Sequence, residues 1–325
     1  MASRLSTLDR LVALIRETSS SLPEDVRAAL RTALRREARG SSAAVVLRTI
    51  LDNCALAAKN GTPLCQDTGT LTFFVDANLR RRVTPALLQQ AVARATALGY
   101  LRKNTIDAVT GKSFDDNCAE GAPVVHYVER EQGTGSRERG IGNRGRGAVT
   151  LLLKGGGSEN MSRQYSLPDA TLGAGRDLAG VRACVLDAVQ KIQGYGCAPG
   201  ILGICIGGDR ATGFEVAKEQ LLRPLDDGEG RRKKEKGKRN REEEGKRAES
   251  EALVRLEKEL LREANALGIG PMGLGGKTTL LGVKVAARTR LPASFFVTVA
   301  YMCWACRRQT IVLGRSGRSS TLETP

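Results

Sequence analysis

The sequence predicts an α+β protein, and three observations support that class. The first 60 residues carry apolar side chains at helical spacing. Short apolar runs bounded by glycine and polar residues follow, and such runs are typical of strands. Helical and extended patterns then succeed one another without a clear βαβ alternation. We therefore expect N-terminal helices followed by a mixed α/β region.

Three helices are expected in the N-terminal part, over about 1–60. Leucines and other aliphatic side chains repeat at helical spacing from Leu5 to Ile15. Pro23, followed by two acids, is typical of a first helical turn, because proline lacks the N–H that would remain unpaired there. Ser41 or Ser42 can cap the third helix. Cys54 falls on the apolar stripe of that helix, so we interpret it as a small buried hydrophobic residue.

The remaining elements follow from their apolar patterns. We predict strands at 71–75, 124–128, 148–153, 201–206, 279–286 and 295–300, and helices at 84–100, 178–192 and 253–268. All belong to one expected catalytic domain over 1–315. Low-complexity segments at 131–147 and 226–250 are expected to be mobile insertions, and 316–325 a disordered tail.

The chain has 325 residues, 41% of them hydrophobic, and a formal net charge of +16. Half of that excess falls in residues 130–146 (net +3) and 229–247 (net +5), which overlap the two insertions. Aromatic residues make up only 4%, so platforms for stacking nucleic-acid bases are scarce. A basic module that binds nucleic acid is the alternative outside enzymes, and we favour incidental basic loops over it. No apolar run is long enough to span a bilayer, and no secretory signal is recognisable, so we expect a cytoplasmic protein.

Cys65 stands in the most informative segment, Pro-Leu-Cys-Gln-Asp-Thr-Gly-Thr, where an amide and a carboxylate directly follow a thiol. A buried structural cysteine does not need such neighbours, whereas a cysteine that anchors a metal beside a polar substrate does. Cys197, between Gly196 and Ala198-Pro199, and Cys303, before Trp304, also have unusual neighbours. Three distant thiolates that converge would suggest an iron–sulfur cluster, although their wide spacing does not by itself establish a metal site. A disulfide framework is disfavoured in a long chain without a signal peptide.

Two glycine-rich segments and one histidine complete the candidates. Three glycines followed by Ser-Glu-Asn (154–160) could form either an anion-binding nest or a flexible turn. The segment 268–279 is not a P-loop, because Pro271 occupies the position of the first required glycine. We expect it to pack tightly and to line the same site. His126, the only histidine, is more readily a satisfied strand residue than a catalytic base.

Taken together and in this order, these segments resemble the catalytic α part of class I fumarases and of the related L-tartrate dehydratases. The resemblance runs from about Leu11 to Leu313. It includes the Cys65 segment, Leu101-Arg102 with Asp107, 154–162, 196–208, 268–279 and the Cys303-Trp304-Ala305 end. It implies the iron-dependent fumarase α fold, with a mostly antiparallel sheet.

The resemblance implies an oxygen-sensitive 4Fe–4S cluster held by Cys65, Cys197 and Cys303. Its fourth iron would be open and act as a Lewis acid toward a small dicarboxylate substrate. The implied activity is that of a hydro-lyase, the reversible hydration of fumarate to L-malate in the tricarboxylic acid cycle. Dehydration of L-tartrate to oxaloacetate is the alternative within the family, and the sequence does not separate the two.

The resemblance also implies roles for individual residues. Gln66 and Asp67 match family residues beside the substrate, with Asp67 as the catalytic one. Arg102 matches an arginine that pairs with a substrate carboxylate, a role that suits its planar fork. Gly156 and Asn160 match positions where the family loop contacts substrate.

Several features depart from the family pattern. Leu291 and Arg308 each stand where a histidine is found in family members, which puts one substrate contact in doubt. Both insertions exceed the family pattern. We recognise no swivelling β domain, which in the family supplies further basic contacts. We therefore expect a separate β subunit, and a higher oligomer of αβ units.

Overall fold

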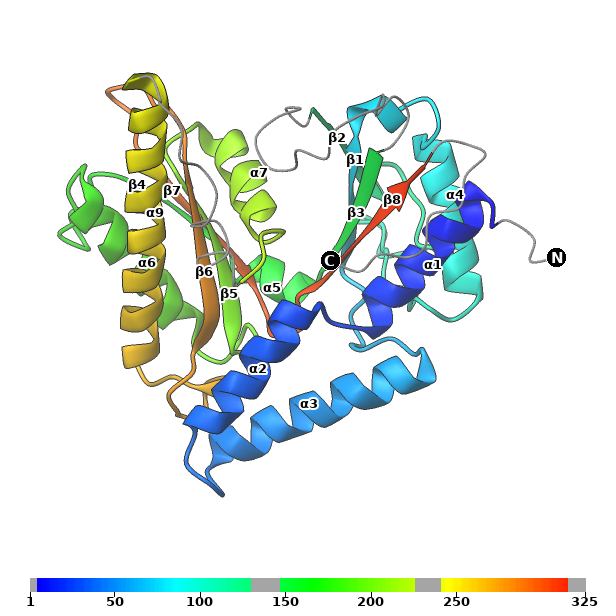
Figure 1. Ribbon diagram of the computed structural model, residues 1–325, viewed down its shortest axis with the longest axis horizontal. Coiled ribbons are helices and arrows are strands. Elements are labelled where there is room, and N and C mark those ends of the chain that lie inside the picture. The colour runs from blue at the N-terminus through cyan, green and yellow to red at the C-terminus, as the bar shows by residue number, and fades with distance from the viewer. Residues whose placement is uncertain (1–4, 130–146, 226–240, 315–325) are drawn as a thin grey trace. The chain divides into compact units, whose positions relative to one another are not determined.

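The computed structural model describes residues 5–129, 147–225 and 241–314 (Figure 1). The helices are α1 Thr7–Ser20, α2 Glu24–Arg36, α3 Ser42–Asn60, α4 Pro85–Ala97, α5 Gly156–Asn160, α6 Leu178–Ile192, α7 Arg210–Gln220 and α9 Arg241–Ala266. The strands are β1 Thr70–Asp76, β2 Val124–Val128, β3 Gly147–Lys154, β4 Arg163–Ser166, β5 Gly200–Ile206, β6 Leu280–Ala287, β7 Phe296–Met302 and β8 Arg307–Leu313. The protein is therefore α+β, as predicted.

The chain forms two compact units. The first unit comprises Met1–Pro23, Asn53–Gly155 and Arg307–Pro325, and the second comprises Glu24–Asp52 and Gly156–Cys306. This division runs through the single catalytic domain expected over 1–315. It also divides the helical N-terminal part, because α3 contributes residues to both units.

The first unit is built on a mixed four-stranded sheet in the order β2-β1-β3-β8. β1 pairs in parallel with β2, whereas the pairings of β1 with β3 and of β3 with β8 are antiparallel. Helix α1 packs against α4, β3 and β8 and buries its leucine face there (Figure 1). Ser6 begins α1 with a capping box that involves Asp9.

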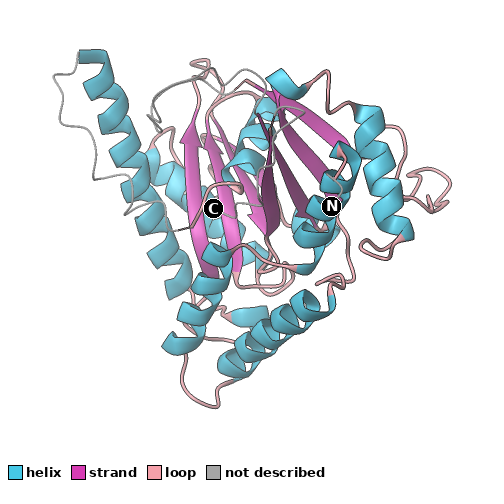
Figure 2. Ribbon diagram, turned by 45° about the vertical axis from the view of Figure 1, so that its right-hand side comes forward, coloured by secondary structure: helices cyan, strands magenta, loops and turns pink. Residues whose placement is uncertain are grey.

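The second unit is built on a mixed sheet in the order β4-β7-β5-β6, with only the β5–β6 pairing parallel. Helices α6 and α9 lie together on one face of this sheet, and α7 covers the other (Figures 1 and 2). Because both faces are covered, the central strand β5 is buried along its whole length.

The apolar patterns of the sequence predicted most of these elements. The bounds of β2 and α6 match the prediction, and those of β1, β3, β5, β6 and β7 lie within two residues of it. Ser41 is the cap of α3, because its Oγ accepts from the Ala44 N–H at 3.2 Å. Cys54 is 6% exposed, as its place on the apolar stripe predicted.

Five elements differ markedly from the predictions. The segment expected as a nest or flexible turn contains the short helix α5, and β4, α7 and β8 were not predicted. Within the second charged segment, residues 241–250 belong to α9. Residues 131–146, 226–240 and 316–325, for which we predicted mobility or disorder, lie outside the described residues.

Candidate active site

Cys65 lies in the loop between α3 and β1, in the first unit. Both backbone groups of the preceding residue, Leu64, are held: its N–H donates to the Ser19 carbonyl at 2.8 Å, and its carbonyl accepts from Asn53 Nδ2 at 3.1 Å. The Leu64 side chain is buried. The Cys65 thiol is half-buried, and Gln66 is exposed. The loop is thus fixed at its base and presents Gln66 to solvent.

The carboxylate of Asp67 is held in one orientation. Its Oδ1 accepts from the Gly69 N–H at 2.8 Å and from Asn104 Nδ2 at 3.2 Å. Its backbone carbonyl accepts from Arg307 Nη2 at 2.8 Å. A Cβ at position 155 would lie 2.9 Å from Asp67 Oδ2, so Gly155 leaves the room that this carboxylate occupies.

Gly69 satisfies a requirement for both conformation and space. Its φ is +75°, and a Cβ there would lie 2.5 Å from the backbone of Lys154. Glycine at position 69 is therefore required for the loop to pass against β3. The Asp67 N–H lies 3.5 Å from the Cys65 Sγ.

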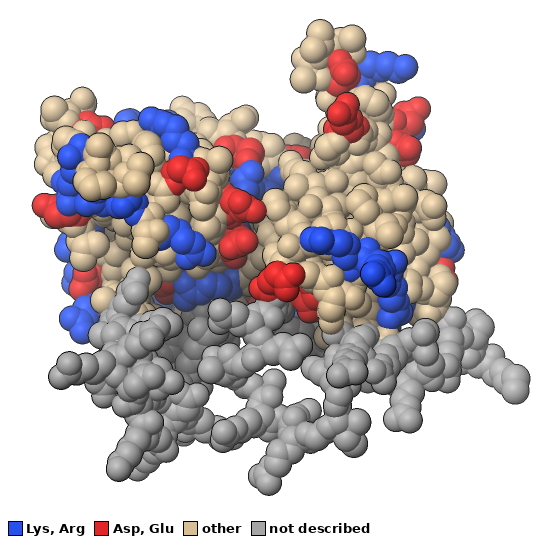
Figure 3. Space-filling model, turned by 90° about the horizontal axis from the view of Figure 1, so that it is seen from above, with Lys and Arg blue, Asp and Glu red and all other residues tan. Residues whose placement is uncertain are grey.

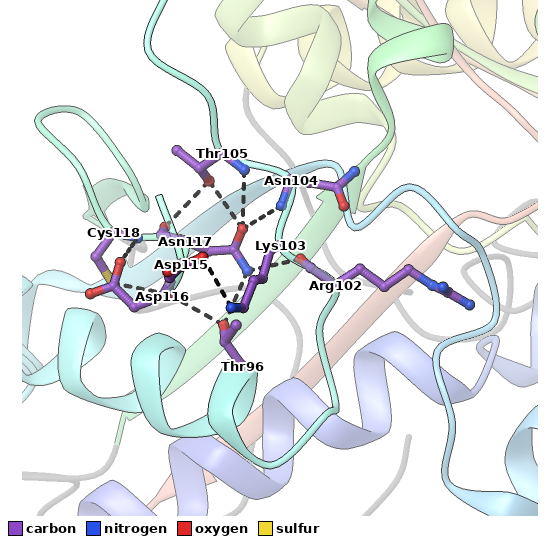
Figure 4. A network of polar contacts seen from close by, with 9 residues as sticks. All are labelled: Thr96, Arg102, Lys103, Asn104, Thr105, Asp115, Asp116, Asn117 and Cys118. Atoms are coloured by element: carbon purple, nitrogen blue, oxygen red, sulfur yellow. Dashed lines mark hydrogen bonds and ion pairs between the residues drawn. The ribbon is translucent and has the colours of Figure 1, made fainter. Parts of the chain in front are cut away.

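Side chains hold both the backbone N–H and the backbone carbonyl of Arg102. Thr68 Oγ1 accepts from the Arg102 N–H and donates to the Arg102 carbonyl, both at 2.9 Å. Thr68 is 2% exposed, whereas Arg102 is exposed. In Figure 4 the Arg102 side chain extends away from the polar network that holds its carbonyl oxygen. Arg102 is thereby brought to the Cys65–Asp67 loop within the first unit.

Asn117 is the centre of that network (Figure 4). Its side chain is fully buried, and its φ is +60°. Its Nδ2 donates to the Arg102 carbonyl at 2.9 Å and to Thr96 Oγ1 at 3.1 Å. Its Oδ1 accepts from the N–H groups of Asn104 at 2.8 Å and Thr105 at 3.1 Å. One amide thus ties the Arg102 segment to helix α4.

Cys197 and Cys303 lie at the same end of the sheet of the second unit. Cys197 precedes β5 and Cys303 follows β7, and these two strands are antiparallel neighbours with Ile201 opposite Met302. The start of one strand therefore lies beside the end of the other. The Trp304 N–H donates to the Cys197 carbonyl at 3.3 Å, which joins the two cysteine segments directly. Cys197 is exposed and has a φ of +55°, which is uncommon for a residue with a side chain.

The segment that carries Gly156 and Asn160 packs beside Cys303. Both residues lie on α5 and are exposed. Between them, the buried Ser158 accepts at Oγ from the Cys303 N–H at 3.1 Å. Gly156, Asn160, Cys197 and Cys303 are therefore gathered within the second unit, as Cys65, Gln66, Asp67 and Arg102 are within the first.

Tyr301 lies beneath the Cys197 turn and was not predicted from the sequence as a residue of the site. A Cβ at Gly196 or at Gly200 would lie 2.3 Å from the Tyr301 ring, so these two glycines leave the space that the ring fills. Burial, together with the Cys303 and Cys197 thiols, raises the pKa of this phenol well above its usual value. The paired glycines around Cys197 were the available signal, but a sequence does not reveal which side chain occupies the space that they leave.

The glycine-rich segment 268–279 packs against the same turn, as expected. The Met272 N–H donates to the Ala198 carbonyl at 2.9 Å, and the Gly200 N–H donates to the Thr279 carbonyl at 3.0 Å. Gly273 also approaches Gly194 closely, because a Cβ at Gly273 would lie 2.9 Å from the Gly194 Cα. This segment therefore supports the Cys197 turn from one side.

The eight cysteines, all within the described chain, divide by exposure, and none forms a disulfide. Cys54, Cys184, Cys205 and Cys306 are buried, whereas Cys65, Cys118, Cys197 and Cys303 are at least partly exposed. The Cys118 Sγ already contacts the Gln89 carbonyl at 3.4 Å. The three thiols predicted as ligands are among the four that are at least partly exposed, and thiolates are the usual ligands of iron–sulfur clusters. Among the described residues, no group of three His, Cys, Asp or Glu side chains forms a metal site of its own.

Two further sequence candidates can be placed. His126 lies on β2, half-buried, with its ring stacked on Phe74 at a centroid distance of 5.2 Å, which fits a strand residue. Leu291, which replaces a family histidine, is 72% exposed.

Charge on the described surface is mixed. On the face drawn in Figure 3, basic and acidic side chains are interspersed and do not form a continuous basic surface. Of the helices in the described part of the chain, none is both long and apolar enough to cross a membrane.

The chain matches the fumarate hydratase (Fumerase) family over residues 9–312. It belongs to this family. A fumarate hydratase class I of Geobacillus stearothermophilus is 44% identical over 300 residues, which cover 91% of this chain and 52% of that protein. The chain thus spans about half the length of this fumarate hydratase relative.

Relatives named as L(+)-tartrate dehydratase subunit alpha are also similar. The one from Methanocaldococcus jannaschii is 32% identical, over 92% of this chain and 95% of the relative. The one from Escherichia coli K12 is 27% identical, over 91% of this chain and 86% of the relative. The suspected family is therefore confirmed, with relatives named for both substrates.

Proposed function

We propose that this chain is the α subunit of a cytoplasmic iron–sulfur hydro-lyase of the fumarase α type that interconverts fumarate and L-malate. The observation that carries the proposal is the 44% identity, across 91% of the chain, to a protein named fumarate hydratase class I. The anchored Cys65-Gln66-Asp67 loop and the Cys197–Cys303 end of the second sheet support it.

Cys65, Cys197 and Cys303 would hold the 4Fe–4S cluster in this proposal. When bound, the cluster would supply an open iron that acts as a Lewis acid toward a substrate oxygen. The division of the cysteines by exposure supports this assignment, because Cys65, Cys197 and Cys303 are all at least partly exposed, whereas four of the other cysteines are buried.

The other proposed residues bind substrate or handle its proton. The Arg102 guanidinium would bind a substrate carboxylate, and its clamped backbone limits the positions that this cation can take. Gln66 and Asn160 would orient polar groups of the diacid, and the backbone at Gly156 would permit close approach. Asp67 would accept or return a proton, because a carboxylate held by two donors at Oδ1 keeps its orientation.

We also propose a separate β subunit and a higher oligomer of αβ units. The support is that two relatives similar to nearly all of this chain are named as alpha subunits, whereas the Geobacillus relative is about twice as long as the matched region. L-Tartrate dehydration is the second candidate function, because those alpha subunits are named for it.

Anaerobic reconstitution of the αβ complex with iron and sulfide, followed by assay on fumarate, L-malate and L-tartrate, tests the proposal. We expect cluster absorbance in the visible range and hydration of fumarate. Dehydration of L-tartrate alone would replace the lead substrate with the second one. A complex that holds iron and sulfide but acts on none of the three diacids would reject the proposal.

Three substitutions test the ligands. Cys65→Ser, Cys197→Ser and Cys303→Ser should each abolish the absorbance, because each removes one of three thiolate ligands. Cys306→Ser is the matched control, because this nearby cysteine is fully buried and should not be needed for cluster binding. A full absorbance band in any of the three variants would mean that its cysteine is not a ligand.

A further inference from the structure

The Tyr301 hydroxyl is a buried polar group that lacks a hydrogen-bond partner among the described residues. Tyr301 is 1% exposed, and its Oη contacts no donor or acceptor there. Buried phenols usually have a partner, because an unsatisfied polar group inside a protein is costly. The hydroxyl group of a tyrosine can donate one hydrogen bond.

The position of the ring shows where an acceptor would lie. The Tyr301 ring passes between Gly196 and Gly200, and a Cβ at Gly200 would lie 2.4 Å from Tyr301 Oη. The hydroxyl is therefore at the base of the turn that carries Cys197. The backbone of Tyr301 is fixed as well, because its N–H donates to Ser162 Oγ at 3.2 Å.

One side of Tyr301 is apolar and the other carries thiols. Tyr301 belongs to the core cluster of the second unit together with Val299, Leu202 and Val189, which offer no polar side-chain atom. Cys303 follows two residues later and packs against the same cluster. Cys197 precedes β5 and Cys303 follows β7, so two sulfur atoms are carried at this same end of the sheet.

We propose that the Tyr301 hydroxyl donates a hydrogen bond to a sulfur atom held at the Cys197–Cys303 end of the sheet, either a thiolate or a cluster sulfide. The inference rests on the proposed function, because the acceptor forms part of the cluster site. Tyr301 is then a positioning residue: it touches no substrate, but it orients the sulfur ligands and stabilises the more negative, reduced cluster. Hydrogen bonds to sulfur are among the factors that set the potential of such clusters.

Tyr301→Phe in the reconstituted αβ complex tests the inference, because it removes one oxygen and keeps the ring between the glycines. We expect a lower reduction potential, faster bleaching of the cluster in air, and a smaller deuterium shift of the iron–sulfur vibrations than in the wild type. Tyr165→Phe is the matched control. It also removes a phenol oxygen from the second unit, but one that donates to Asp187 at 2.8 Å, and the cluster properties should stay unchanged.

The outcomes separate this inference from the proposed function. If the wild type binds the cluster and Tyr301→Phe matches it in potential, bleaching and isotope response, the inference is rejected and the proposed function stands. If the wild type binds no cluster, both are rejected. The isotope measurement on the wild type needs no variant, so it decides the question even if Tyr301→Phe fails to fold: vibrations unaffected by deuterium would reject the hydrogen bond.

Discussion

The side chains of Asn117 and Thr68 each form several hydrogen bonds that hold the segment carrying Arg102. The Asn117 side chain makes contacts at both Nδ2 and Oδ1, and all of them stay within the first unit. Thr68 uses one hydroxyl to hold both backbone groups of Arg102. Neither role was predicted from the sequence, because Asn and Thr are common in loops and the partners of these two residues lie 12 to 34 positions away. The Cys65 segment was selected, since its unusual residues are adjacent.

Asn117→Ala should lower both stability and substrate affinity. It removes the partner of buried backbone groups, at a cost of about 2–3 kcal/mol, and it releases the segment that carries Arg102. We expect a higher KM for the diacid with a smaller change in kcat, together with a lower midpoint in urea. Asp115→Ala is the control on the same loop, because its exposed ion pair with Lys103 contributes little. Equal effects of the two variants would contradict the role given to Asn117.

The buried thiol of Cys184 should make the protein less stable at alkaline pH. Burial, together with Asp169 and Asp187, raises the pKa of this thiol from 9.0 to about 11. Below pH 9 the thiol is protonated whether the chain is folded or unfolded. Above it the unfolded chain releases the proton more readily, so stability falls as the pH rises from about 9 to about 11.

Urea titrations of the wild type and of Cys184→Ala across this range measure the effect. The free energy of unfolding of the variant should decline less steeply with pH. Parallel declines would show that Cys184 does not contribute.

At the scale of elements, close approach between backbones determines where glycine is required. Gly203 lies in the middle of β5, where a Cβ would lie 2.0 Å from the Ala217 carbonyl oxygen of α7. The glycine therefore sets the distance between the helix and the sheet. A similar relation exists in the first unit, where Gly69 lets the Cys65 loop pass against Lys154.

Gly203→Ala should lower the free energy of unfolding by about 1–3 kcal/mol, because α7 or β5 must shift to accommodate the methyl group. Gly157→Ala is the matched control, since a Cβ there would meet nothing within 4 Å. Thermal or urea unfolding compares the two variants. A loss in Gly157→Ala as large as that in Gly203→Ala would argue against the close contact.

The sequence predicted elements whose apolar pattern matches their burial and missed those whose pattern does not. α6 shows a clear helical period and β2 is a short apolar run, and both were located to the residue. β8 was missed because it begins with Arg307 and Arg308, which a sequence reading treats as exposed although the fold buries both. α7 was missed because four charged residues and a glycine interrupt its apolar side. The apolar patterns also did not reveal that β5 and β7 are antiparallel neighbours, so the proximity of the Cys197 and Cys303 segments was expected only from the family resemblance.

At the scale of the whole molecule, the formal charge favours binding to nucleic acid, whereas the mixed charge of the described surface does not. The chain carries +16, yet the described face in Figure 3 mixes both signs. Residues 131–146 and 226–240, outside the described residues, carry net charges of +2 and +3, about a third of this excess. The nucleic-acid alternative therefore depends on those two segments, whereas a hydro-lyase does not need them.

A variant of the αβ complex that lacks 131–146 and 227–239 should keep its activity on the diacid. Any binding of the complex to a DNA or heparin column should weaken, because the deleted segments carry a net positive charge. Activity and elution salt concentration are the two measurements. Loss of activity with an intact cluster would assign these segments a part in catalysis.

The position of Trp304 has a practical consequence. It is the only tryptophan in the chain, it follows Cys303, and its backbone N–H is bonded to the Cys197 carbonyl. Its indole is therefore a single natural fluorophore next to two of the proposed ligands. Iron–sulfur chromophores absorb at the wavelengths at which indole emits, so occupancy could be followed in real time as quenching of this one signal, without any added dye.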